Sequence, residues 1–198
     1  RFGDAEIDLY EALASHFRAD DIFLVLDESN GPVNVPTGKY RKLAFDKSLL
    51  AELGLYAEGS KIGWLCGDYF IYRLRLEVEA DYYWLVEPDV RFSFPDPGNF
   101  FRKFSAVEED FLAPAFNMRG PDWYWHKFAV DLAPNVYGCL FPLTRTSGRA
   151  ADALLDARRE WNRRRKSGQC PNDESFVATT LMAKGFTCTL PTRMAPCT

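Results

Sequence analysis

Hydrophobic residues along the chain switch between helical and continuous spacing, which predicts helices and buried strands in turn. Asp4 is expected to cap a helix, because apolar residues at positions 9, 10, 13 and 17 share one helical face. The next run, 22–26, is continuously apolar, as is typical of a strand buried on both faces of a parallel sheet. The chain therefore opens with a predicted helix followed by a predicted interior strand.

The same reading continues toward the middle of the chain. Asp46 is predicted to cap a short helix that ends at Gly54. A small strand is expected at 64–66, and Asp68 is expected to cap a helix that reaches about residue 79. The sequence YYWLV at 82–86 then predicts a second buried strand.

The second half of the chain repeats the alternation. We expect a helix, a short strand, an irregular aromatic stretch and a third strand at 98–110, 111–116, 123–128 and 136–143. Helices are predicted from Ser147 to about 166 and from a cap at Asn172 to 185, before a last strand at 186–190. The pattern predicts one domain over residues 1–198, a three-layer α/β/α fold with a mostly parallel sheet.

Two carboxylates follow the carboxyl end of the predicted strand 82–86. Pro88 separates Glu87 from Asp89, fixes its own φ and favours extended geometry at the residue before it. Residues i and i+2 of an extended segment point the same way, so the two carboxylates should project together. They form a natural ligand set for Mg²⁺ or Mn²⁺ bridging a diphosphate, and the alternative is a pair of solvated loop acids.

A buried strand that ends in an acid-x-acid step resembles the nucleotide-sugar glycosyltransferases whose single, Rossmann-like α/β domain is called the A fold. In that family the step is often Asp-x-Asp, and here it is Glu87-Pro88-Asp89. The segment 64–84 is similar to the family's helix before this strand, and 135–157 to its Gly-containing apolar strand. The segment 170–186 resembles its late acidic motif. These pieces occur in the family's order, over about residues 20–190.

The resemblance implies an enzyme that transfers a sugar from a nucleotide-diphosphate donor to a carbohydrate or other hydroxyl acceptor, in cell-surface polysaccharide or glycan synthesis. Glu87 and Asp89 would hold the metal ion or the donor, and Tyr137 and Gly138 would line the sugar pocket. In inverting members the late motif supplies the base, which here is Asp173 or Glu174, with a slight preference for Asp173 as the earlier acid.

The late acids also have a complete structural explanation. Asn172 can cap the helix, and Asp173 and Glu174 suit its first turn, where carboxylates interact well with the helix dipole. Two further residues are donor-site candidates by position alone. Arg145 follows a predicted strand and could contact a diphosphate, whereas Asp27 ends the first strand at the same sheet edge as Glu87 and could contact the nucleoside.

The stretch at 123–128 offers an acceptor site. The ring faces of Trp123 and Trp125 suit the C–H faces of a sugar, and His126 could act as a base or a ligand. Packing in the core or at an interface is the alternative for the rings, and a satisfied structural histidine is the alternative for His126.

Two features depart from the family pattern. The family's first strand is not seen ahead of Arg1, and the late His that often completes the metal site has no counterpart, because His16 and His126 both precede the late motif. A non-catalytic relative that binds carbohydrate or a protein partner is therefore a second hypothesis. A hydrolase that uses a metal ion at Glu87 and Asp89 is a third.

Composition and charge limit the classes of binding partner and the expected cellular location. The net charge of −4 argues against a general nucleic-acid binder, because neutralising phosphates needs a basic surface. No signal-peptide pattern opens the chain, and no apolar run approaches the roughly 18 residues of a membrane span, so a cytoplasmic location is expected.

The basic run 158–166 is expected to be a solvated helix end, or a contact to an anionic acceptor or a membrane surface. Five scattered cysteines without a CxxC pair predict reduced thiols and no zinc site.

Overall fold

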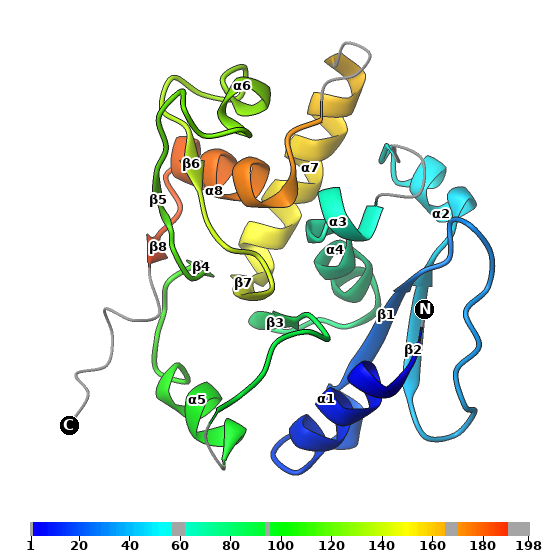
Figure 1. Cartoon of the computed structure of the whole chain (residues 1–198). Helices are drawn as coiled ribbons and strands as arrows, with labels where there is room; N and C mark the ends of the chain where they lie inside the picture. Colours follow the sequence, from blue (N-terminus) through cyan, green and yellow to red (C-terminus); the bar gives the residue numbers. More distant parts are fainter. Residues whose placement is uncertain (1, 57–61, 94–95, 165–169, 190–198) are drawn as a thin grey trace.

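The computed structural model describes residues 2–56, 62–93, 96–164 and 170–189, which form a mixed α/β fold (Figure 1). Its helices are α1 (Asp4–Ala14), the 3₁₀ helix η1 (Ala19–Asp21), α2 (Lys47–Glu52), α3 (Ile62–Leu65), α4 (Asp68–Glu77), α5 (Pro97–Lys103), α6 (His126–Ala129), α7 (Gly148–Arg164) and α8 (Asp173–Ala183). Its strands are β1 (Phe23–Asp27), β2 (Arg41–Phe45), β3 (Tyr82–Val86), β4 (Phe111–Leu112), β5 (Asn117–Met118), β6 (Tyr137–Gly138), β7 (Leu143–Ser147) and β8 (Cys188–Thr189). The prediction of an α/β fold is thus confirmed at the level of fold class.

The strands of the described residues form three small sheets. β1 pairs with β2 in parallel, and β5 pairs with β6 in antiparallel fashion. The central sheet has the order β3-β7-β4-β8, in which β7 runs antiparallel to both of its neighbours and only β4 and β8 are parallel. The central sheet is therefore mixed, which differs from the mostly parallel sheet that the alternation of elements predicted.

The third predicted strand is divided because Pro142 interrupts it. Proline lacks the N–H that a ladder needs, so the segment 136–143 does not continue as one strand. The part before Pro142 pairs as β6 with β5, and the part after it becomes β7 beside β3. Ser147 ends β7 and also begins the next helix, where its Oγ accepts a hydrogen bond from the Ala150 N–H at 3.2 Å. The predicted start of that helix at Ser147 is confirmed in this sense.

Arg145 explains why the helix predicted over 98–110 ends early. Its guanidinium is buried and donates to the carbonyls of Phe104, Val107 and Glu109, at 2.7, 2.7 and 3.0 Å. These carbonyls therefore face the side chain of β7 and cannot all continue an α-helical ladder. As a result α5 ends at Lys103, and residues 104–109 form an irregular link to β4.

Two predicted caps are confirmed and two are wrong. The side chains of Asp46 and Asn172 accept hydrogen bonds from the N–H groups of Leu49 and Ser175, as expected of N-caps. Helix α1 instead takes Gly3 as its N-cap, because the Glu6 carboxylate accepts the Gly3 N–H. Helix α4 takes Gly67, because the Asp68 side chain is engaged in the interior.

The remaining differences concern short elements. The segment expected as a strand at 64–66 belongs to the helical turn α3, where the Cys66 N–H bonds to the Ile62 carbonyl at 2.8 Å. The stretch 123–128 was expected to be irregular, yet it leads into the short helix α6. Strand β2 was not predicted at all, since Arg41 and Lys42 are polar and exposed, and only the three residues after them are apolar, with Leu43 and Phe45 buried.

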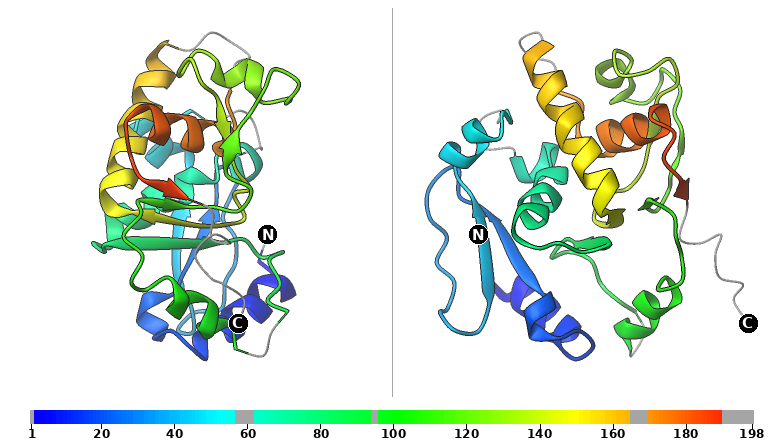
Figure 2. Two further views of the ribbon diagram at one scale, coloured as in Figure 1. Left: turned by 90° about the vertical axis from the view of Figure 1, so that its left-hand side faces the viewer. Right: turned by 180° about the vertical axis from the view of Figure 1, so that it is seen from behind.

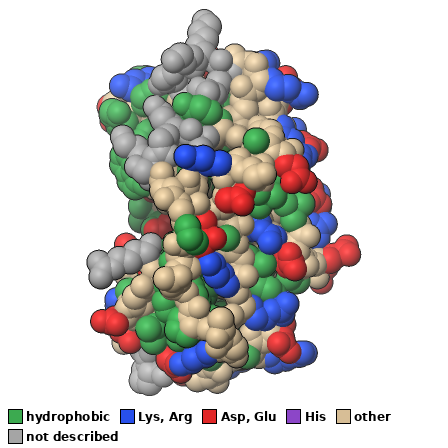
Figure 3. Space-filling model, turned by 90° about the vertical axis from the view of Figure 1, so that its right-hand side faces the viewer, with side chains coloured by type: hydrophobic (Ala, Val, Ile, Leu, Met, Phe, Trp, Pro, Cys, Tyr) green, Lys and Arg blue, Asp and Glu red, His purple; other side chains and the backbone are tan. Residues whose placement is uncertain are grey.

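The core lies where α4, α7 and α8 pack together beside the central sheet, as the two further views of the ribbon show (Figure 2). The largest fully buried apolar side chains include Tyr69, Tyr72, Phe111, Phe141 and Phe176. No helix within the described ranges combines the length and apolarity needed to cross a bilayer. On the face that looks away from this core, beyond β2, acidic and basic side chains are interspersed (Figure 3).

Candidate functional site

The starts of helices α4 and α8 meet in the interior of the molecule. Asp173, in the first turn of α8, accepts a hydrogen bond from the Gly67 N–H at 2.8 Å. A Cβ at residue 67 would lie 2.6 Å from Asp173 Oδ2 and 3.0 Å from the Phe141 ring, so only glycine allows this approach. The late acidic motif is therefore fixed to the segment that enters α4.

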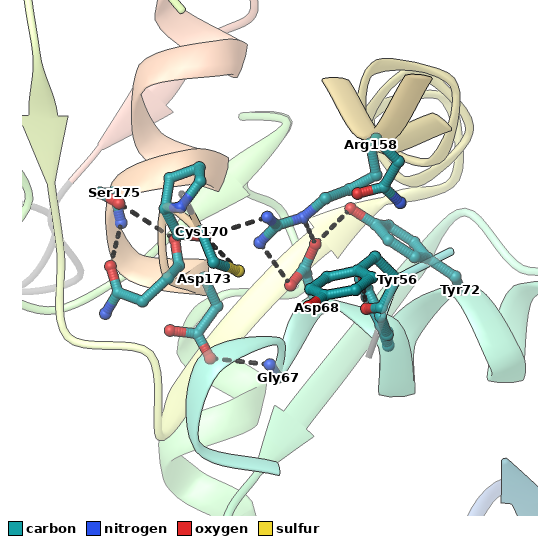
Figure 4. A network of polar contacts seen from close by, with 12 residues as sticks. Tyr56, Gly67, Asp68, Tyr72, Arg158, Cys170, Asp173 and Ser175 are labelled. Carbon is teal, nitrogen blue, oxygen red and sulfur yellow. Dashed lines mark hydrogen bonds and ion pairs between the residues drawn. The ribbon is translucent and has the colours of Figure 1, made fainter. Parts of the chain in front are cut away.

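A buried ion pair stands behind this contact (Figure 4). Asp68 accepts two hydrogen bonds from Arg158 of α7, at 2.7 and 3.0 Å, and neither side chain is exposed to solvent. Tyr72 donates to the same carboxylate at 2.7 Å, and Arg158 also donates to the Pro171 carbonyl at 3.0 Å. One guanidinium thus joins α7 to α4 and to the segment that leads into α8. The sequence-based expectation that Arg158 belongs to a solvated basic face is wrong.

Asp173 lies in the interior next to this ion pair. Its side chain is 4 % exposed, and burial together with the nearby charge of Asp68 raises its pKa to about 8. The hydrogen bonds from the N–H groups of Gly67 and Glu174, and the charge of Arg158, partly oppose this rise. Its burial and its backbone contacts suit a positioning role more than direct contact with an acceptor molecule.

Glu174 is the half-buried neighbour of Asp173 and is within electrostatic range of Glu87. Burial raises the pKa of Glu174, while a hydrogen bond from the Asn172 amide at 3.2 Å and the charge of Arg119 act against this rise. Burial and the charges of Asp89 and Glu174 raise the pKa of Glu87. The structure therefore brings together acids from the end of β3 and the start of α8, which are far apart in the sequence.

Glu87 and Asp89 leave β3 through a turn and not through an extended segment. The Val90 N–H donates to the Glu87 carbonyl at 3.0 Å, with Pro88 at the second position of the turn, where proline is favoured. Glu87 itself is partly buried and Asp89 is exposed. The prediction of extended geometry is wrong, although the two carboxylates are still close enough for their charges to interact.

Asp27 and Glu87 line one cavity of about 340 Å³, as expected of acids at the carboxyl ends of two strands. Asp27 also accepts a hydrogen bond from the Ser29 N–H at 2.9 Å, which closes the turn after β1. We refer to this space as the Asp27–Glu87 cavity.

Glu87 and Asp89 could hold a metal ion only together with a bound substrate that supplies further ligands. Among the described residues, no three His, Cys, Asp or Glu side chains gather closely enough to hold a metal ion. Glu87 and Asp89 nevertheless supply the one or two carboxylates with which Mg²⁺ is usually held when substrate phosphates complete its coordination. The two carboxylates therefore suit a divalent cation that arrives with a diphosphate, and they do not suit a permanently bound ion.

Arg145 does not take part in the site formed by these acids. Its guanidinium donates hydrogen bonds to three carbonyls within residues 104–109 and lies over the Tyr82 ring, 4.0 Å from the ring centroid. With only 2 % exposure, it is not presented to a diphosphate. The structure gives Arg145 a role in holding the link between α5 and β4, so we leave it out of the donor site.

Tyr137 and Gly138 lie in β6, against the middle of α8. The Tyr137 N–H donates to Thr179 Oγ1 at 3.0 Å, and the Thr179 hydroxyl donates back to the Tyr137 carbonyl at 3.1 Å. A Cβ at residue 138 would lie 2.5 Å from the Trp123 ring, so this glycine makes room for an aromatic side chain. Trp123, predicted to bind an acceptor, therefore packs on the strand predicted to line the donor pocket.

Trp125 and Phe128 are partly buried and pack with the exposed rings of Trp64 and Tyr124, and we call these four residues the aromatic surface. The Trp64 and Trp125 ring centroids lie 5.8 Å apart, and those of Tyr124 and Trp125 lie 4.8 Å apart. Trp64 and Tyr124 are 65 % and 61 % exposed, which is unusual for such large rings. Trp64 was not predicted to lie here, because it was assigned to a small strand. His126 begins α6, beside this surface and partly buried.

The cysteines of the described residues are reduced thiols, as predicted, and Cys66, Cys139 and Cys170 are buried. Cys197 lies outside the described residues, as do Arg165 and Lys166 of the basic run. Compared with known proteins, the chain matched no family model, no curated protein and no solved structure.

Proposed function

We propose that this protein is a glycosyltransferase-like enzyme that transfers a sugar from a nucleotide-diphosphate donor to a hydroxyl acceptor. The observation that carries the proposal is that the charges of Asp89 and Glu174 both act on Glu87, although β3 and α8 are distant in sequence. Acids at the end of β3, within electrostatic range of an acid at a helix start, would provide both a donor-phosphate site and a base. The resemblance described above, which rests on the same residues, supports this assignment.

In this proposal the donor binds at the mouth of the Asp27–Glu87 cavity. Glu87 and Asp89 would hold a Mg²⁺ or Mn²⁺ ion that enters with the diphosphate, and the ion would supply neutralisation of the charge on the leaving group. Asp27, at the end of β1 in the same cavity, would accept hydrogen bonds from the hydroxyl groups of the nucleoside. The proposal includes the three-layer arrangement, in which such sites lie at the carboxyl ends of the strands.

Glu174 is the base in this proposal for an inverting transfer. Its carboxylate would take the proton of the acceptor hydroxyl as that oxygen forms a bond to the anomeric carbon of the donor sugar. The bond from the anomeric carbon to the diphosphate oxygen breaks at the same time, and the diphosphate leaves with the electron pair. Because burial raises the pKa of Glu174, its carboxylate is a stronger proton acceptor than a solvated glutamate. Asp173 would hold the start of α8 against Gly67 and thereby position Glu174.

The aromatic surface is the acceptor site of this proposal. Gly63, which adjoins Trp64 in α3, lines the same cavity as Glu87, so the surface borders the place where the donor would bind. Exposed rings suit the C–H faces of a carbohydrate, and Trp64 and Tyr124 are the exposed rings of this surface. A sugar stacked on either ring would have hydroxyl groups free for reaction.

A non-catalytic carbohydrate-binding protein is the second candidate. It is favoured by one observation, the lack of a third protein ligand near Glu87 and Asp89 among the described residues. In that case the aromatic surface would bind carbohydrate without any turnover of a donor.

A donor screen separates the two candidates. The protein is incubated with UDP-, GDP- and other nucleotide sugars, with and without Mn²⁺, and release of the nucleoside diphosphate is measured together with carbohydrate binding. The enzyme predicts turnover that falls at least about a hundredfold in Glu174→Gln, as is usual for the loss of a general base. Turnover should also fall in Glu87→Gln, which removes a carboxylate that would hold the metal ion. Glu79→Gln is the matched control, since Glu79 is exposed after α4. Carbohydrate binding without turnover of any donor would establish the second candidate and reject the enzyme.

A further inference from the structure

Arg119, directly after β5, is a partly buried cation that is not paired with an acid. Among the described residues, every other arginine that is at least partly buried forms an ion pair, apart from Arg145 with its three backbone carbonyls. The Arg119 guanidinium, which has five N–H donors, forms one hydrogen bond within the described residues, from Nη2 to the Ala115 carbonyl at 3.1 Å. Its Nε is buried without a hydrogen-bond partner there.

The surrounding structure holds this cation in place at a cost in free energy. The guanidinium carbon lies 5.2 Å from the centroid of the Trp123 ring, within the range of a cation–π contact. Ala115, whose carbonyl accepts the hydrogen bond, has a φ of 52°, in the left-handed region that residues other than glycine rarely adopt. Backbone strain and buried donors without partners both destabilise a fold, and they persist mainly where function requires them. The arrangement of Arg119 therefore indicates a binding residue.

Arg119 lies near the proposed base. Strand β6, which pairs with β5, packs against α8, and the first turn of α8 carries Glu174 (Figure 1). Burial raises the pKa of Glu174, and the charge of Arg119 acts against this rise. Among the described residues, the charges that act on the pKa of Glu87 are those of Asp89 and Glu174, which add to the larger effect of burial. Arg119 is thus closer to the proposed base than to Glu87, which would hold the diphosphate.

The chemistry of a guanidinium specifies the group that would bind to it. Its planar array of N–H donors matches the oxygen atoms of a carboxylate or a phosphate. The negative charge of Glu174 would repel such an anion, so the anion would lie at Arg119 while a neutral hydroxyl group of the same molecule meets Glu174. A sugar that carries a carboxylate or a phosphate has both groups on one ring. Trp123, under the guanidinium, also precedes Tyr124 of the aromatic surface, where the acceptor is proposed to bind.

We propose that the acceptor is an acidic carbohydrate, whose carboxylate or phosphate group binds to Arg119 while its hydroxyl group meets Glu174. The inference rests on the proposed function for the role of this sugar as acceptor, and it adds the class of the substrate. Arg119 would select acidic over neutral sugars and would take no part in the proton transfer.

The test compares acidic sugars with their neutral counterparts. Calorimetry measures the binding of trisaccharides that end in glucuronic acid, galacturonic acid or glucose 6-phosphate, and of those that end in glucose or galactose, with and without UDP and Mn²⁺. The protein should bind at least one acidic sugar about tenfold or more tightly than its neutral counterpart, as expected for hydrogen bonds to a charged group. Arg119→Gln should abolish this preference and leave the binding of neutral sugars unchanged, whereas Arg119→Lys should retain part of it.

Lys127→Gln is the matched control. Lys127 is exposed, and its Nζ lies 4.6 Å from the centroid of the Tyr124 ring, so this variant removes another cation from the same region. It should leave the preference for acidic sugars intact. Thermal melting followed by circular dichroism reports whether each variant is folded, and if Arg119→Gln did not fold, the comparison of sugars on the unaltered protein and on Arg119→Lys would still decide.

Four outcomes would overturn the inference. Equal affinity of the unaltered protein for acidic and neutral sugars would mean that no anion is selected, and equal loss in Lys127→Gln would mean general attraction of anions. A matching loss of UDP affinity in Arg119→Gln would place Arg119 at the diphosphate. Equal losses of acidic and neutral sugars would mean that Arg119 only tunes Glu174. Because sugar binding is measured without turnover, these results can be told apart from failure of the proposed enzyme activity, which the donor screen reports.

Discussion

Replacing Arg158 by methionine tests the buried ion pair that ties α7 to α4 and to the start of α8. Methionine keeps much of the length of the side chain but removes both hydrogen bonds to Asp68 and the one to the Pro171 carbonyl. Because neither side chain of the pair is exposed, the Asp68 carboxylate would be left buried without its cation. Breaking such a pair from one side costs about 3–5 kcal/mol.

That free energy converts into a large change in thermal stability. For a chain of 198 residues, each kcal/mol shifts the melting temperature by about 2–4 °C, so Arg158→Met should lower it by about 6–20 °C. Circular dichroism during heating, together with urea denaturation at 25 °C, measures both quantities. Arg163→Met is the matched control, because Arg163 lies on the same helix, pairs with Glu160 and is 73 % exposed; it should cost less than about 1 kcal/mol.

A double variant separates the loss of the pair from the loss of packing. Asp68→Leu combined with Arg158→Met removes both charges, so it should be more stable than Arg158→Met alone, since no charge is left buried without a partner. The reasoning would be refuted if Arg158→Met cost no more than Arg163→Met, or if the double variant were the less stable of the two. Either result would mean that solvent reaches the Asp68 carboxylate.

Three further predictions concern the elements around this pair. Asp173 keeps its proton in the folded state up to a pKa of about 8, whereas an unfolded aspartate ionises near 3.9. The unfolded state therefore binds fewer protons between these values, so the free energy of unfolding should fall as pH rises from about 4 to 8, by at most about 1.4 kcal/mol per pH unit. Urea titrations at several pH values should show this slope, and Asp173→Asn should flatten it; an equal slope in the variant would contradict the assignment. Asn172→Ala removes the cap of α8 and should cost about 1 kcal/mol in urea denaturation, whereas Asn172→Ser should retain most of the stability. Gly138→Ala should cost about 1–3 kcal/mol by forcing the Trp123 ring to move, with a shift in tryptophan fluorescence, and unchanged emission would show that the ring already has room.

Local signals in the sequence predicted those parts of the fold that local physics determines. The strand 82–86 is recognisable because five consecutive bulky residues have no helical period, and the cap at Asn172 because two acids suited to a first helical turn follow it. The pairing of the strands is not local, so the antiparallel position of β7 between β3 and β4 could not be read from the alternation of elements. The polar sequence LTRTS also gave no sign that this strand is interior.

For the candidate site, the sequence named the acids as candidates, but their arrangement could not be predicted from it. Glu87 and Glu174 were both named in advance, and their mutual proximity needed the fold. The ion pair was missed because Arg158 was grouped with its basic neighbours. One signal could have revealed it: Arg158 lies on the same helical face as Leu154, Leu155 and Trp161, all of which are buried. A charged residue on an apolar stripe indicates a buried partner elsewhere in the chain.

The Asp68–Arg158 pair also has a consequence for the order of events in folding. The two residues are 90 positions apart, so their contact requires most of the chain to have come together first. A charged pair is stabilised only once water has been excluded around it, so we expect the pair to form after the barrier that limits the folding rate. Its contribution then acts mainly on the rate at which the native protein opens and hardly on the rate at which it forms. The ion pair would thus slow unfolding and lengthen the lifetime of the folded state.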